Sequence, residues 1–167
     1  MGFEHQLTRI ESVETLNLDH IRRAAQLEGI RTVERLTLEI SDVRVWGGKP
    51  GVGLWVATSV ESGLVIAMGG ITVCPTNPEF RRVRRFYVHP AWRRQGVGRA
   101  IAQLCIAKAR QAGIRVVTCN AAASSGAPLF WEVMGFLPTF ETDVTHRYVL
   151  EDTGGSRGRV GRRNPGN

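Results

Sequence analysis

The chain has 167 residues and a formal net charge of +7, with 43% hydrophobic and 22% charged residues. This balance is typical of one globular domain with a full core, and it excludes a disordered or low-complexity chain. The sequence lacks the roughly 18 consecutive apolar residues that a membrane span requires, and its first residues do not resemble a secretory signal. We therefore expect a cytoplasmic protein with no membrane partner.

The cysteines and arginines narrow the chemistry further. Cys74, Cys105 and Cys119 show neither a CxxC motif nor Cys/His spacing, so the sequence predicts no disulfide framework and no metal site. All basic residues except Lys49 and Lys108 are arginines. Arginine stays protonated at any working pH, which favours binding of phosphate or carboxylate groups over a role as a base.

The first half of the chain predicts a strand, two helices and a meander. Residues 5–11 fit an opening strand, and residues 13–28 and 31–43 space their apolar side chains as amphipathic helices do. Three β-rich runs follow the turn signal Gly47-Gly48-Lys49-Pro50-Gly51, at residues 53–60, 64–73 and 81–88, with residues 74–78 as a loop. Their order predicts antiparallel pairing.

The second half predicts alternating helices and strands. These are a helix at 98–112 ended by Gly113, a strand at 114–119, a helix at 124–134, and strands at 136–140 and 144–150. From residue 151 onward Gly and Arg replace apolar residues, so we expect one domain over 1–150 and a disordered tail over 151–167. The tail lacks interleaved aromatic residues, so no nucleic-acid partner is expected.

The most informative segment joins the strand that ends at Val88 to the helix that begins near Gly98. Gly96 and Gly98 remove Cβ atoms, so a ligand can approach the backbone where the helix exposes unpaired N–H groups. Arg93, Arg94 and Arg99 add positive charge, which favours a pyrophosphate. The alternative is that the glycines only allow a tight turn; a Rossmann or P-loop motif is absent.

This segment, Arg93-Arg94-Gln95-Gly96-Val97-Gly98, resembles the Q/R-x-x-G-x-G/A pyrophosphate loop of the GNAT superfamily of acyl-CoA N-acyltransferases. The run from Phe130 to Phe136 is similar to the family's FYxxxGF segment. The resemblance implies an α+β fold with a mainly antiparallel, twisted sheet and helices on both faces. In this sheet the strands near 81–88 and 114–120 would be parallel neighbours that splay apart.

The resemblance also implies that acetyl-CoA is the cosubstrate and lies across the splayed strands. The implied contacts are Tyr87, Val88, Arg93, Arg94, Gln95, Gly96, Val97, Gly98, Arg99, Asn120 and Phe130. The backbone N–H near Val88 would polarise the thioester carbonyl. Asn120 would contact pantetheine or an ordered water; the alternative is that it caps the end of its strand.

Two positions depart from the family pattern. Arg82 stands where a glutamate base is often found, and Trp131 replaces the usual tyrosine acid. Neither side chain can perform the corresponding proton transfer at neutral pH, so the general base and acid stay unassigned. Five other titratable residues are weaker candidates: His89, Tyr87, His146, Tyr148 and Glu79.

The arginines of the strand at 81–88 suggest the charge of the acceptor. In a regular strand Arg82 and Arg84 share one face, and residues 81, 83 and 85 share the other. Arg82 and Arg84 would then face the acceptor, which would carry a carboxylate or phosphate. The alternative is a solvated surface.

We therefore expect direct acetyl transfer from acetyl-CoA to a primary amine of a small, anionic molecule in a ternary complex. Cys119, beside Asn120, is the one thiol to check as a nucleophile. A CoA-binding sensor with reduced catalysis and a protein N-terminal or lysine acetyltransferase are the alternatives. The assembly state stays open, with a homodimer as one option.

Overall fold

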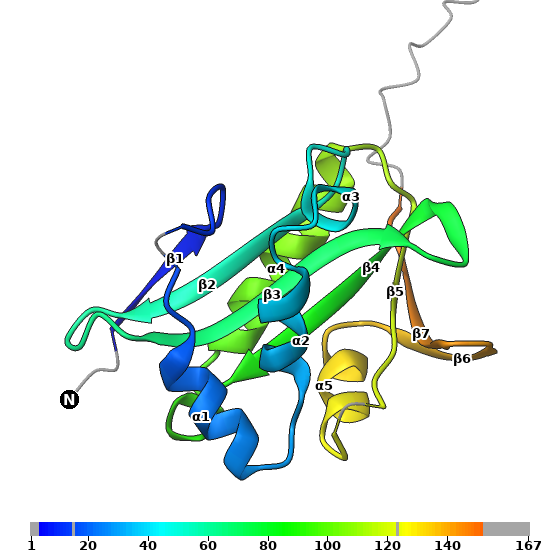
Figure 1. The fold of residues 1–167 in the computed structure, drawn as a ribbon. Helices are drawn as coiled ribbons and strands as arrows, with labels where there is room; N and C mark the ends of the chain where they lie inside the picture. The colour runs from blue at the N-terminus through cyan, green and yellow to red at the C-terminus, as the bar shows by residue number, and fades with distance from the viewer. Residues whose placement is uncertain (1–3, 15, 123, 152–167) are drawn as a thin grey trace, which may run out of the picture.

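The structure is a computed structural model that describes residues 4–14, 16–122 and 124–151, in which helices cover a twisted seven-stranded sheet (Figure 1). Its elements, in chain order, are β1 (His5–Arg9), α1 (Asp19–Leu27), α2 (Thr32–Glu39), α3 (Val43–Trp46), β2 (Gly53–Ser59), β3 (Val65–Cys74), β4 (Asn77–Val88), a 3-10 turn (Pro90–Trp92), α4 (Val97–Gln111), β5 (Val116–Cys119), α5 (Ala127–Val133), β6 (Leu137–Glu141) and β7 (Val144–Val149).

The strands follow the order β1-β2-β3-β4-β5-β7-β6. All neighbours are antiparallel except β4 and β5, which are parallel and pair at two positions, the second joining Arg82 to Thr118. Beyond this pair β4 continues to Val88, whereas β5 ends at Cys119. The two strands therefore splay apart, and the predicted fold is confirmed.

Helices lie on both faces of the sheet (Figure 1). α4 packs on one face against β2, β3 and β4, where Ile101 and Val83 belong to the same buried cluster. α1 and α2 pack on the other face against β3 and β4, where Ile21 and Leu36 join Met68. Burial of both apolar faces is the main stabilising contribution, and it holds β4 between two layers of helices.

The first two predicted helices have different bounds in the structure. Helix α1 begins at Asp19, after Asn17 Oδ1 accepts a hydrogen bond from the Asp19 N–H at 2.9 Å. The helix predicted at 31–43 ends at Glu39, and a separate short helix begins at Val43, where the Asp42 side chain accepts the Arg44 N–H and caps it. Both differences come from short polar side chains that compete for backbone N–H groups.

Strand β4 begins earlier than predicted. Cys74 of β3 pairs with Asn77 of β4, so the connection between the strands is the two-residue turn Pro75-Thr76. The segment 74–78, expected as a loop, is therefore mostly strand. A two-residue turn is a common connection between antiparallel strands, and it extends β4 to twelve residues.

A bulge interrupts β4 opposite β3. Residues 68–70 of β3 face residues 84–87 of β4, so β4 carries one extra residue there, and Arg85 has a φ of 60°. Regular alternation does not continue through a bulge. The expectation that Arg85 lies on the face opposite Arg84 is therefore wrong: both side chains contact Glu39 of α2.

Three further predictions concern the whole chain. In the part of the chain that the structure describes, no helix has both the length and the apolar character of a membrane span. The three cysteines are free thiols and are buried. The predicted tail, 151–167, lies outside the described residues except for Glu151, so its disorder stays a prediction.

Candidate active site

The segment between β4 and α4 has the geometry of an anion-binding loop. Gly96 has a φ of 82° and immediately precedes α4, so it offers no side chain to cap the first turn of the helix. The N–H groups of that turn are available to an anion. At Gly98, a Cβ atom would lie 3.2 Å from Val88 Cγ2 and 3.6 Å from the Phe130 ring. The backbone conformation therefore favours glycine at 96, and close packing favours it at 98.

The side chains of this loop add charge on the solvent side. Arg94, Gln95 and Arg99 are exposed, and Arg94 has a φ of 63°. The Gln95 side chain folds back and donates to the Ala91 carbonyl at 3.1 Å. Two arginines thus flank the N-terminus of a fifteen-residue helix, whose dipole favours an anion at that end.

Arg93 is held differently from the other loop arginines. Its Nη1 and Nη2 donate to the two carboxylate oxygens of Glu28 at 2.7 and 2.6 Å, and its Nε donates to the Val88 carbonyl at 3.0 Å. The Tyr87 hydroxyl donates to the same carboxylate at 2.7 Å. The hydrogen bonds from Arg93 lower the pKa of Glu28, although partial burial opposes them. Burial and the neighbouring Glu28 raise the pKa of Tyr87.

The end of β4 presents an open edge on the side from which β5 has turned away. The His89 N–H donates to the Ile66 carbonyl at 2.8 Å, which places His89 at a hydrogen-bonded position of the β3–β4 ladder. Backbone groups alternate along an antiparallel strand. Those of Val88 therefore point away from β3, toward the open edge, and those of Tyr87 point toward β3. Of Tyr87 and Val88, which are both expected to contact the cosubstrate, the register puts only Val88 at that edge.

Phe130 and Trp131, on α5, lie near the loop but in different environments. Phe130 is half-buried beside Gly98. Trp131 is 5% exposed, and its ring centroid lies 4.8 Å from those of Phe86 and Phe130 in edge-to-face contacts. Trp131, which stands at the position of the family's usual tyrosine, is therefore part of the core, where its aromatic neighbours stabilise it.

Asn120 connects the end of β5 to the β6–β7 turn. Its Nδ2 donates to the Asp143 carbonyl at 3.3 Å, and its Oδ1 accepts the Ala122 N–H at 3.0 Å. The residue is exposed at the end of its strand. These contacts fit the strand-end cap, and the predicted contact with pantetheine stays a prediction.

Both candidate histidines are shielded from solvent, His89 in part and His146 almost completely. His89 stacks on His20 with 4.6 Å between ring centroids, beside a groove of about 550 Å³, and its Nδ1 accepts the Ala91 N–H. Burial, and then the neighbouring His20, lower the pKa of His89. His146 is 5% exposed and contacts Thr145 at 2.8 Å and Glu132 at 3.3 Å.

The other candidates for proton transfer or covalent chemistry have little support. Tyr148 packs against Phe136, with 5.3 Å between ring centroids, and Glu79 is exposed near the start of β4. Cys119 is 1% exposed, and burial raises its pKa to about 12. A buried thiol with so high a pKa is a poor nucleophile. Across the described residues, no group of three or more His, Cys, Asp and Glu could hold a metal ion.

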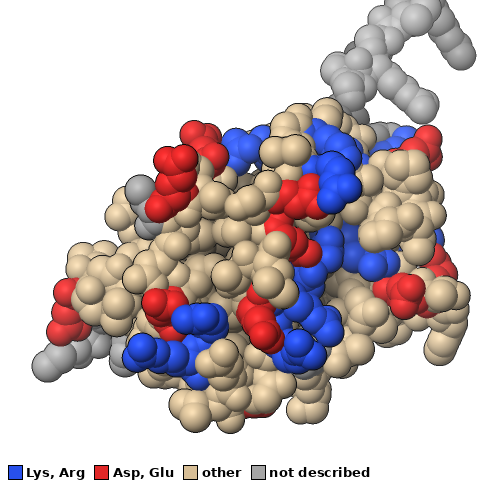
Figure 2. Space-filling view, viewed as in Figure 1, with Lys and Arg blue, Asp and Glu red and all other residues tan. Residues whose placement is uncertain are grey.

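An arginine patch lies on the α1–α2 face of the sheet, formed by Arg82, Arg84 and Arg85 of β4 and Arg147 of β7. Figure 2 shows a band of basic side chains between α2 and the side of the molecule where α5 and β7 lie. Arg82, Thr118 and Arg147 occupy one row across β4, β5 and β7. The structure thus brings both predicted acceptor arginines to one face.

Two carboxylates that the sequence analysis did not identify bind the arginines of this patch. Glu39 closes α2 and binds Arg84 and Arg85, and Glu141 of β6 binds Arg147 at 2.6 Å. Glu39 is 45 and 46 residues away from its partners. No local pattern marks a pairing over that separation.

Comparison with known proteins places these features in context. Residues 50–138, more than half of the chain, match the family model for an Acetyltransferase (GNAT) domain. A protein from Exiguobacterium sp. 255-15 that is described as an acetyltransferase is 22% identical, with a TM-score of 0.76 over 87% of this chain and 93% of its own. No curated protein sequence matches the chain.

Two other solved structures have the same fold at lower identity. A GNAT family acetyltransferase from Brucella melitensis, in complex with acetyl-CoA, is 12% identical, with a TM-score of 0.63 over 90% of each chain. Glucosamine-6-phosphate N-acetyltransferase from Arabidopsis thaliana is 14% identical, with a TM-score of 0.56 over 83% of this chain and 95% of its own.

Proposed function

The chain belongs to the GNAT acetyltransferase family, whose chemistry is acyl transfer from acetyl-CoA, and we propose that its acceptor is the primary amine of a small, anionic molecule. The observation that carries acetyl transfer from acetyl-CoA is the position of the open edge at Val88 directly beside the Gly96–Gly98 loop. An edge and a helix N-terminus side by side suit a long cosubstrate with amides and a pyrophosphate.

We assign the cosubstrate contacts on the same basis. The α4 N-terminus with Arg94 and Arg99 binds the pyrophosphate, and the Val88 N–H donates to the thioester carbonyl. The other proposed contacts are Arg93, Gln95, Gly96, Val97, Gly98, Asn120 and Phe130, whereas the backbone of Tyr87 pairs with β3 and does not reach the open edge. For Arg93 to bind phosphate, its guanidinium has to leave or share Glu28.

The proposed reaction is direct attack in a ternary complex. The amine nitrogen attacks the thioester carbon, the C–S bond breaks, the thiolate of CoA leaves and takes a proton, and the amine gives up a proton to solvent. Both nearby carboxylates, Glu28 and Glu39, are held by arginines, and Arg82 occupies the usual position of the base. Positioning of the reactants therefore contributes most of the catalysis.

The anionic character of the acceptor rests on Arg82 and Arg84. They lie on the face of the sheet opposite α4, with one carboxylate, Glu39, shared between Arg84 and Arg85. This excess of positive charge attracts an anion and repels a polyamine. The Arabidopsis thaliana structural neighbour is named for an acceptor that carries both an amine and a phosphate.

Two observations favour a second candidate, a CoA-binding sensor. Trp131 is buried at the usual position of the acid, and no free carboxylate lies at the usual position of the base. A protein N-terminal or lysine acetyltransferase is the third candidate. The arginine patch favours it less, because this patch attracts anionic acceptors. Turnover separates the sensor from both enzymes.

The test is thiol release from acetyl-CoA with panels of small amines and of peptides. The proposal predicts acetylation of a small anionic amine and little acetylation of spermidine or peptides. CoA binding without release of thiol by any amine would instead support the sensor.

A further inference from the structure

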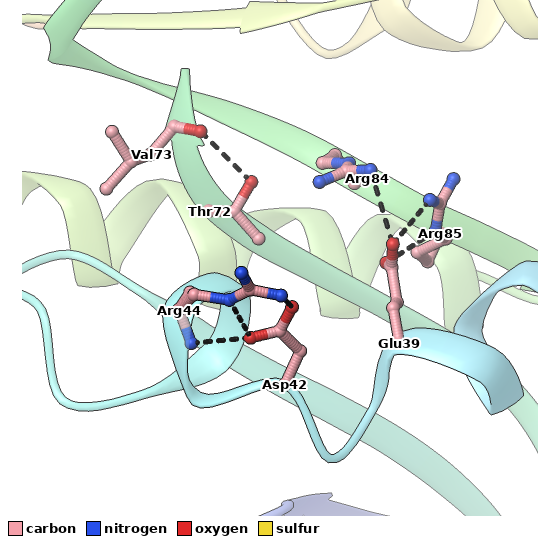
Figure 3. A network of polar contacts seen from close by, with 7 residues as sticks. All are labelled: Glu39, Asp42, Arg44, Thr72, Val73, Arg84 and Arg85. Atoms are coloured by element: carbon pink, nitrogen blue, oxygen red, sulfur yellow. Dashed lines mark hydrogen bonds and ion pairs between the residues drawn. The ribbon is translucent and has the colours of Figure 1, made fainter. Parts of the chain in front are cut away.

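The arginine patch holds more guanidinium hydrogen-bond donors than the carboxylates beside it can satisfy. Arg85 is saturated on one edge: its Nε and Nη2 donate to the two oxygens of Glu39 at 2.7 Å each. Arg84 reaches the same carboxylate only through Nη2, at 3.5 Å (Figure 3). A bidentate pair of this geometry is strong, whereas a single contact at 3.5 Å is weak. Glu39 therefore neutralises Arg85 and leaves Arg84 largely uncompensated.

Arg82 carries the clearest sign of an anion-binding site. Its Nε and Nη2 atoms are buried and have no hydrogen-bond partner among the described residues. These two atoms form the same edge of the guanidinium that Arg85 presents to Glu39. A buried donor without an acceptor is costly, and a carboxylate or phosphate satisfies two such donors at once. Because the residue is only half-buried as a whole, a side-chain rotation can present this edge to a ligand.

The charges of this cluster act on one another. Burial lowers the pKa of Arg84, and the neighbouring Arg85 and Arg82 lower it further, while Glu39 opposes them. The three guanidinium groups are therefore close enough to repel one another in a partly desolvated site. An oxyanion bound between Arg82 and Arg84 would relieve that repulsion.

The strand sets the distance from this anion site to the reacting amine. Val88, which would hold the thioester carbonyl, lies four positions after Arg84, with the bulge between them. At about 3.3 Å per strand residue, the two backbones are about 10 Å apart, and Arg82 is further still. The carboxylate of an α-amino acid lies too close to its nitrogen to span this interval. The cation nearest to Val88 is Arg93, which donates to the Val88 carbonyl and is already paired with Glu28.

We propose, on the premise of the proposed acetyltransferase function, that the acceptor holds its amine and an oxyanion apart by a spacer, and that Arg82 and Arg84 bind the oxyanion. The oxyanion is a carboxylate or a phosphate at the far end of the molecule from the amine. Amines without an anion, and α-amino acids, are poor acceptors. Arg82 and Arg84 are thus specificity-determining residues.

The test compares matched acceptors at saturating acetyl-CoA by thiol release. 6-Aminohexanoate is compared with glycine and hexylamine, and glucosamine 6-phosphate with glucosamine, so that the two pairs distinguish carboxylate from phosphate. We expect kcat/KM for at least one spaced anionic amine to exceed that of its matched neutral amine by about tenfold or more, and 6-aminohexanoate to exceed glycine.

The variants Arg82→Gln and Arg84→Gln should each remove most of this preference by raising KM for the anionic acceptor. CoA affinity should not change, and hexylamine, which has no anion for these arginines to bind, should lose far less than the anionic acceptor; Arg110→Gln, an exposed residue near the end of α4, should behave as wild type. Turnover of amines without a preference for spaced anions, or a preference that survives both substitutions, would overturn this inference alone. No turnover of any amine by protein that binds CoA would overturn the proposed function as well.

Discussion

Arg85 and Glu39 join the bulge of β4 to the end of α2 through two hydrogen bonds of 2.7 Å. The two side chains are 15% and 19% exposed, so the pair is shielded from solvent. Arg85 has a φ of 60°, a conformation that non-glycine residues seldom adopt. The pair therefore links the backbone conformation of the bulge to the position of α2, which borders the arginine patch.

Glu39→Gln should destabilise the protein, because it leaves Arg85 without a carboxylate in a shielded site. We expect the free energy of unfolding to fall by about 2–3 kcal/mol, measured by urea denaturation. Asp42→Asn is the matched control, since Asp42 binds the exposed Arg44. It should lose much less stability. Equal losses in the two variants would show that the Arg85–Glu39 pair has no special role.

Gly96→Val should reduce CoA affinity more than it reduces stability. The Gly96 φ of 82° makes a β-branched residue unfavourable, and a side chain would stand where the pyrophosphate approaches. Gly113→Val is the control, because Gly113 has a φ of 72°, equally open surroundings and a position after the far end of α4. We expect both variants to lose similar stability, while isothermal titration shows weaker CoA binding only for Gly96→Val. Equal CoA affinity in the two variants would contradict the loop assignment.

The ion pair between Glu28 and Arg93 predicts that the stability of the protein depends on pH. Arg93 lowers the pKa of Glu28 in the folded state below its ordinary value of 4.5. A depressed carboxyl pKa contributes stability above the unfolded value, and this contribution is lost as the pH falls through the folded value. The difference in urea midpoint between wild type and Glu28→Gln should therefore be constant from neutral pH to about 5 and shrink below the ordinary value of 4.5. A difference that grew on acidification would have the wrong sign.

Trp131→Tyr tests whether a tyrosine at position 131 can act as the acid that is usual in the family. Trp131 is buried among Phe86, Phe130 and Phe136, so the smaller ring should leave a cavity and cost about 1–3 kcal/mol of stability. The rate of thiol release per folded molecule should not rise, because the position is enclosed by the core. A large rise in kcat would show that position 131 faces the leaving thiolate.

Most of the correctly predicted helices and strands follow from local patterns in the sequence. The two glycines and the apolar spacing of α4 identify the loop and its helix from residues 96–111 alone. The bulge at Arg85 could not be predicted, because it depends on the register with β3 and on Glu39. The binding of Arg93 by Glu28 was missed for the same reason, since 65 residues separate them.

The most direct test of the central claim is mass spectrometry of the amine during thiol release from acetyl-CoA. Direct transfer predicts one N-acetylated amine for each thiol released, an unmodified protein, and loss of both products in Gly96→Val at limiting acetyl-CoA. Thiol release without an acetylated amine, or an acetyl group retained on Cys119, would contradict direct transfer to a small amine.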